Sequence, residues 1–224
     1  MADIAVLVAR GWTVVVSGFL GPDHEWVAAY VEGRGTLDGI RAAENFAPSG
    51  LGGTSTPVAT MGYSGGARGA EFANELAPTY APELNIVGAA PGGLAVNVAD
   101  VLRTTDGGAF AGVDFAGTLG LDRAYPSLGI SSLLNARGQQ MKRDIATMCI
   151  AQFVATYATQ RIESYTTNGV DPLAWVRSKP SWRRTSAATS AHQRHPRIST
   201  WQETTSSSCR PTTTSWWRSI ARRA

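Results

Sequence analysis

The stretch TPVATMGYSGGARGAEFANEL, residues 56–76, holds a single serine, Ser64, between glycines. Residues 56–62 form a short apolar run of strand length, and glycines interrupt it at once. From residue 67 to residue 76 the apolar positions return at helical spacing, and we expect this helix to stop before Pro78. The stretch therefore predicts a strand, a sharp turn at Ser64 and a helix.

Segments on either side extend the same alternation. WTVVVS (12–17) is a β-branched run of strand length, and LNIVGAA (84–90) is an apolar run flanked by prolines. The segments 3–10 and 25–46 have the spacing of helices. Short apolar strands that alternate with helices indicate a parallel sheet covered by helices, so we predict an α/β fold.

The chain from about residue 96 to residue 176 predicts helices and no further strand. The segments 96–103, 127–138 and 141–158 have helical patterns, and the last of them is long and amphipathic. A block of helices after the third predicted strand is what a cap or lid would require.

The glycines around Ser64 match a catalytic pattern. Gly62, Tyr63, Ser64, Gly65 and Gly66 read G-x-S-x-G, the nucleophile elbow, in which a tight turn from strand to helix exposes a serine hydroxyl. The backbone N–H of Gly65 and the helix N-terminus would then face a developing oxyanion. In the alternative interpretation Ser64 is the N-cap of the following helix. The predicted strand before it and helix after it favour the nucleophile.

Two long stretches carry a resemblance to a known family. MGYSGGARGAEFANELAPTYAPELNIVGAAPGG (61–93) and GPDHEWVAAYVEGRGTLDGIRAAENFAP (21–48) resemble the secretory lipase family of fungi and actinobacteria, and the similarity extends over residues 1 to about 180. The resemblance implies an α/β-hydrolase fold with Ser64 as nucleophile and Gly65 as oxyanion donor. It implies carboxylic esters as substrates, from short-chain esters to triacylglycerols, and no cofactor.

The resemblance also implies a division of the chain. Residues 1–95 would be a partial α/β-hydrolase core, and residues 96–180 a helical cap that lines an acyl-chain tunnel. Members of the family are secreted, with an N-terminal signal and several strands before the segment equivalent to 12–17, whereas this sequence starts without them. Many members also have an oxyanion-hole aspartate where this sequence has Gly18, which removes one hydrogen-bond donor.

The last part of the chain, 181–224, has a different composition. It contains nine Ser, eight Thr, eight Arg and four Trp but no Gly, Leu or Val, and its single acidic residue gives it a charge of +7 within a total of +3. Such a segment cannot bury enough apolar surface to fold, so we predict a disordered basic tail.

The tail also bears on the catalytic partners of Ser64. An α/β-hydrolase places its acid and then its histidine after the nucleophile. The order Ser64, Asp171, His192 exists, and His195 follows, but none of these partners ends a predicted strand, so we expect exposed positions for them.

A shift of reading frame would explain the tail. Trp is encoded only by TGG, which fixes part of the DNA sequence behind TWQETTSSS. If each codon is built from the third base of one residue and the first two bases of the next, this DNA can encode VARDDEL. That peptide is similar to the acid-bearing segment of the family. The same offset suits SWWRSIARR. Our hypothesis is that a frameshift near Pro180 replaced the native C-terminal region, which would leave this chain inactive.

Several function classes are absent from the sequence. It has no apolar run long enough to span a membrane, no phosphate loop, no dinucleotide fingerprint and no metal-binding spacing. Of its two cysteines, we expect Cys149 to be buried. We predict no specific nucleic-acid partner, and the oligomeric state stays open. The alternatives that we keep are an acyltransferase or thioesterase on the same serine and a non-enzymatic binding protein with a basic tail.

Overall fold

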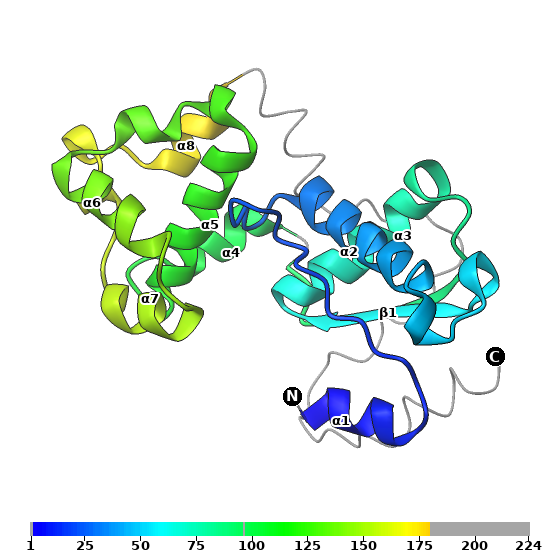
Figure 1. Cartoon of the computed structure of the whole chain (residues 1–224). Helices are drawn as coiled ribbons and strands as arrows, with labels where there is room; N and C mark the ends of the chain where they lie inside the picture. Colours follow the sequence, from blue (N-terminus) through cyan, green and yellow to red (C-terminus); the bar gives the residue numbers. More distant parts are fainter. Residues whose placement is uncertain (1, 96, 180–224) are drawn as a thin grey trace, which may run out of the picture.

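The computed structural model describes residues 2–95 and 97–179, and the predicted tail with His192 and His195 lies outside them. The helices and strands in chain order (Figure 1) are α1 (Ala2–Ala9), α2 (Ala29–Glu44), β1 (Val58–Tyr63), α3 (Gly65–Tyr80), β2 (Ile86–Gly92), α4 (Val98–Thr105), α5 (Ala111–Ala124), α6 (Ala136–Ile145), α7 (Ile150–Tyr157) and α8 (Pro172–Arg177). Short 3-10 turns connect several of them, namely Ala47–Ser49, Gly53–Ser55, Pro126–Leu128, Ile130–Leu133, Ile162–Tyr165 and Thr167–Gly169.

The sheet that positions Ser64 consists of β1 and β2, which pair in parallel. Helix α3 connects the two strands and packs back on them, with the Thr60 hydroxyl donating to the Ala70 carbonyl at 3.2 Å. Helix α2 packs on α3 where a Cβ at Gly33 would lie 2.8 Å from the Phe72 backbone. A strand, a crossover helix and a parallel strand confirm the predicted α/β pattern at residues 56–62 and 84–90.

The segment 12–17, predicted as a strand, forms none in the structure. It runs across α2 instead. A Cβ at Gly39 of α2 would lie 2.5 Å from the Ser17 side chain, and a Cβ at Gly35 would lie 3.0 Å from the Phe19 backbone. A strand exists only when another strand supplies its hydrogen bonds. The prediction was therefore wrong, because the β-branched composition of 12–17 does not guarantee a neighbouring strand with which to pair.

Three helix predictions also needed correction. Helix α3 continues past Pro78 to Tyr80, because a proline near the end of a helix removes only one hydrogen bond of the last turn. The segment 127–138 forms two 3-10 turns before α6, with Gly129 at φ 69° between them. The segment 141–158 is two helices, because Cys149 starts a new one: its N–H donates to the Gln152 side chain in a capping box.

Helix α5 lies at the centre of the helical block formed by α4 to α8, which Figure 1 shows on one side of the molecule, away from α2, α3 and β1. Phe115 of α5 is fully buried, with ring centroids 5.4 Å from Tyr157 and 5.1 Å from Tyr165. A Cβ at Gly112 would lie 2.2 Å from the Phe153 carbonyl oxygen, so glycine permits the close approach of α7. This aromatic cluster is the core of the block.

Among the helices that the structure describes, none is long and apolar enough to cross a membrane.

Candidate active site

Ser64 lies between the end of β1 and the start of α3, and its backbone is strained. Its φ of 54° and ψ of −113° fall outside the regions that a residue with a Cβ prefers, at a cost of about 1–3 kcal/mol. The Ser64 N–H donates to the Gly92 carbonyl of β2 at 2.9 Å, and the Ser64 carbonyl accepts from the Arg68 N–H at 3.2 Å. The backbone is thus held at both of its polar groups while the side chain stays exposed.

The Ser64 hydroxyl makes no capping hydrogen bond to α3, although the residue occupies the N-cap position. Serine at that position normally accepts a hydrogen bond from the second or third N–H of the helix. An uncommitted hydroxyl on a strained turn is the arrangement that a nucleophile elbow requires, so the geometry favours this interpretation over a capping role.

The glycines of the motif have unequal structural roles. A Cβ at Gly62 would lie 2.2 Å from the carbonyl carbon of Gly66 and 2.8 Å from the Ala67 nitrogen, whereas a Cβ at Gly65 or at Gly66 would meet nothing within 4 Å. Only the first glycine is therefore sterically required in this structure. The Tyr63 side chain between them is 79% exposed.

The N-terminus of α3 supplies the electrophilic side of the site. Gly65 is the first residue of this 16-residue helix, and a first-turn N–H has no acceptor within its own helix. The aligned peptide dipoles add a partial positive charge at the same end. The Gly65 N–H is thus available to an anionic oxygen next to Ser64.

Neither Asp171, the acid in the order Ser64, Asp171, His192, nor His24 is hydrogen-bonded to Ser64 among the described residues. His24, the histidine of the described residues, is exposed at φ 52°, and its carbonyl accepts a hydrogen bond from Arg123 at 3.2 Å. The Asp171 carboxylate accepts from the Leu173 N–H at 2.8 Å and so caps α8 in the helical block. Within the described part of the chain, no acidic or basic side chain is hydrogen-bonded to the Ser64 hydroxyl.

Cys149 differs from its expected place in the core. The structure has it exposed at the start of α7. Among residues 2–95 and 97–179, no group of three or more His, Cys, Asp or Glu side chains is placed to hold a metal ion.

Sequence reasoning missed an ion pair beneath Ser64. Arg68 lies one helical turn after Ser64, and its Nε contacts Glu32 Oε2 at 3.0 Å, with each side chain only 2% exposed. Burial raises the pKa of the Glu32 carboxyl above its usual value, and the charge of Arg68 opposes that shift. A charged residue among small apolar ones in GGARGAEFA was the signal that could have revealed the pair.

Both members of the pair also hold the backbone of Val27. The Val27 N–H donates to Glu32 Oε1 at 3.0 Å, and the Val27 carbonyl accepts from Arg68 Nη2 at 3.0 Å. Val27 has a φ of 60°, a left-handed conformation that is rare for a β-branched residue.

Comparison with known proteins places the sequence of this chain in a family. Residues 1–175 match the sequence profile of the family described as Secretory lipase. Lipase A of Moesziomyces aphidis is 44% identical over 154 residues, which are 66% of this chain and 32% of that protein. Secreted triacylglycerol lipase LIP1 of Malassezia furfur is 35% identical over 158 residues, which are 70% of this chain and 32% of that protein. The chain therefore spans about a third of the length of these relatives.

Solved structures show the same similarity. The closed state of Candida antarctica lipase A matches with a TM-score of 0.71 and 38% identity, over 80% of this chain and 41% of that one. A second structure of that lipase matches with a TM-score of 0.73 and 34% identity, over 85% of this chain and 44% of the other. The predicted α/β-hydrolase fold is thereby confirmed.

Proposed function

The chain belongs to the secretory lipase family, and from this premise we propose that it carries the nucleophile and oxyanion donor of a lipase-type hydrolase of carboxylic esters. The observation that carries the proposal is the backbone of Ser64, held at φ 54° between β1 and α3 with an exposed, uncommitted hydroxyl. Lipid esters are the substrate class, in keeping with the names of the relatives. The same names support secretion as the setting of the family.

The proposed reaction forms an acyl-enzyme. Ser64 Oγ attacks the ester carbonyl carbon and gives up its proton to a base, and the carbonyl oxygen becomes an oxyanion next to the Gly65 N–H. The bond to the alkoxide then breaks, the base returns the proton to the departing alcohol, and water hydrolyses the acyl-serine to the free acid. This chain's described residues provide the attacking atom and the donor.

The base has to come from outside the described residues. A serine hydroxyl is a weak nucleophile until a base accepts its proton, so we expect the chain to hydrolyse a chromogenic short-chain ester barely above background. Added imidazole can take the place of a missing histidine side chain, which makes the latent nucleophile measurable.

The test is covalent labelling of the full chain with an alkyl phosphonate ester, read by mass spectrometry of the peptide with residue 64. We expect one adduct, on Ser64, that forms faster as imidazole is added, is absent in Ser64→Ala and persists in Ser132→Ala, a matched surface serine of the helical block. Adducts spread over several serines, or an adduct that Ser64→Ala leaves unchanged, would show that Ser64 is no nucleophile. Robust ester turnover without imidazole would show that the chain holds its own base.

A further inference from the structure

Val27 connects the sheet side of the molecule to the helical block. Its side chain packs against two buried clusters, which include Leu102 of α4, Leu121 of α5 and Leu173 of α8. A Cβ at Gly117 of α5 would lie 3.6 Å from both Val27 methyl carbons, so the side chain rests against the surface of that helix. Val27 is therefore one of the residues through which the chain before α2 contacts α5.

The conformation of Val27 does not arise from its own preferences. A β-branched residue avoids positive φ, and the surrounding structure must hold it there. The Glu32–Arg68 pair does so directly, because one member binds the Val27 N–H and the other binds its carbonyl. A planar guanidinium suits this task, since it can donate to Glu32 and to the carbonyl in fixed directions at once.

A buried ion pair of this kind is weak evidence for a gain in stability. Removing two charges from water costs about as much as their attraction returns, and a well-packed apolar pair of similar size is often as stable. The pair is more simply explained by the geometry that it imposes. The backbone N–H of Arg68 binds the Ser64 carbonyl while its side chain binds the Val27 carbonyl, so the same residue lies next to both the serine turn and Val27.

We propose that Glu32 and Arg68 are positioning residues that fix the helical block relative to Ser64, by holding Val27 in its left-handed conformation against α5. Under the proposed function, an ester held at Ser64 extends its acyl chain past the elements beside the serine turn, and we extend the proposal to the chain lengths that fit there. The part of the inference that concerns chain length rests on the proposed function, whereas the part that concerns α5 does not.

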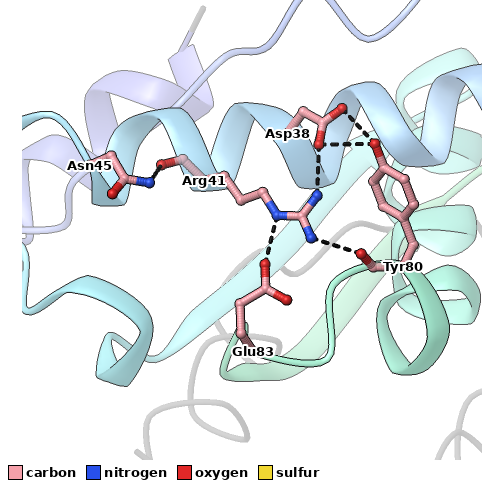
Figure 2. Close-up of polar contacts among 5 residues, drawn as sticks. All are labelled: Asp38, Arg41, Asn45, Tyr80 and Glu83. Carbon is pink, nitrogen blue, oxygen red and sulfur yellow. Dashed lines mark hydrogen bonds and ion pairs between the residues drawn. The ribbon is translucent and has the colours of Figure 1, made fainter.

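The full chain offers a matched control at the other end of the same two helices. Figure 2 shows Arg41 of α2, which donates to Glu83 at 2.6 Å and to the Tyr80 carbonyl at 2.7 Å. This partly exposed cluster also connects α2 to the end of α3, and none of these hydrogen bonds involves Val27. Arg41→Met thus removes a contact between the same helices without changing the held backbone.

The first measurement is amide hydrogen exchange of the full chain. The double variant Glu32→Leu, Arg68→Met removes both charges together, so that no unpaired charge is left buried. We expect the amides of α5 to exchange at least about tenfold faster in this variant, measured against the amides of α3 in the same chain, as in a local opening. Arg41→Met should leave α5 exchange as in the parent chain. Unchanged α5 exchange in the folded double variant, or equal acceleration in Arg41→Met, would overturn the proposal.

The second measurement is the ratio of Ser64 labelling by a long-chain and by a short-chain alkyl phosphonate in the presence of imidazole. In the double variant we expect this ratio to change by at least about tenfold, roughly the discrimination that one methylene group produces in an apolar site. An unchanged ratio would overturn the chain-length part. If neither phosphonate labels the parent chain, the proposed function fails, and α5 exchange still decides the positioning role.

Should the double variant not fold, Arg68→Lys keeps the buried charge but replaces the guanidinium fork with one ammonium group. We expect faster α5 exchange in this variant as well, and unchanged exchange would refute the role of the fork.

Discussion

A buried carboxyl group in the helical block makes the stability of this chain depend on pH. Asp114 of α5 is 1% exposed, its Oδ1 accepts from the Thr118 hydroxyl at 3.3 Å, and its Oδ2 has no hydrogen-bond partner. Burial, reinforced by the negative charges of Asp106, Asp171 and Glu163, raises the pKa of Asp114 to about 8. The folded protein therefore keeps this group protonated at pH values where the unfolded chain has lost the proton.

The sign and size of the pH dependence follow from the raised pKa. Below about pH 4 the group is neutral in both states, so its contribution to folding is fully present. As the pH rises towards 8, the unfolded chain gains from ionising and the folded chain does not, so stability falls. A shift from 3.8 to about 8 corresponds to about 6 kcal/mol at about 1.4 kcal/mol per pKa unit.

The perturbation is Asp114→Asn, which keeps the shape and the acceptor but cannot ionise. The measurement is urea unfolding of the full chain, followed by circular dichroism. The free energy of unfolding of the variant should increase relative to that of the parent as the pH rises, by up to about 6 kcal/mol between about pH 4 and pH 8. Asp23→Asn, at an exposed site before α2, is the control and should follow the parent. A difference between Asp114→Asn and the parent that stays within about 1 kcal/mol across this range would refute the reasoning.

Three further predictions concern the serine turn and the core. Gly62→Ala should lower the free energy of unfolding by about 3 kcal/mol or more, because the added methyl group would clash with the backbone of Gly66. Gly66→Ala should change it by less than about 1 kcal/mol. Equal losses of the two variants in urea unfolding would contradict the close approach at Gly62. Ser64→Gly should abolish phosphonate labelling and raise stability by about 1 kcal/mol through release of the positive φ, and a loss of stability would argue against strain. Phe115→Ala should lower the free energy of unfolding, measured by thermal unfolding, by about 3–5 kcal/mol. A decrease below about 1 kcal/mol would show that the aromatic cluster does not stabilise the helical block.

Local patterns in the sequence were enough to predict the serine turn. The apolar run before Ser64, the glycines around it and the helical spacing after it are short-range signals, and the structure has β1 and α3 at those places. At 84–90 the apolar run alone could not be told from a helix, and the flanking prolines favoured the strand, which the structure has as β2. The elbow itself followed from the spacing of Gly62, Ser64 and Gly66, since the steric demand of the turn lies within five residues.

The remaining features depend on residues far apart in the chain. The segment 12–17 has the composition of a strand, but pairing requires a neighbour that composition does not provide. Val27 takes a positive φ only because Glu32 and Arg68 bind its backbone from two different helices. The sequence alone determined where the chain turns and which serine the turn exposes. The tertiary structure decided which side chains lose their water and which backbone is held under strain, because desolvation and strain are set by the groups that folding brings together.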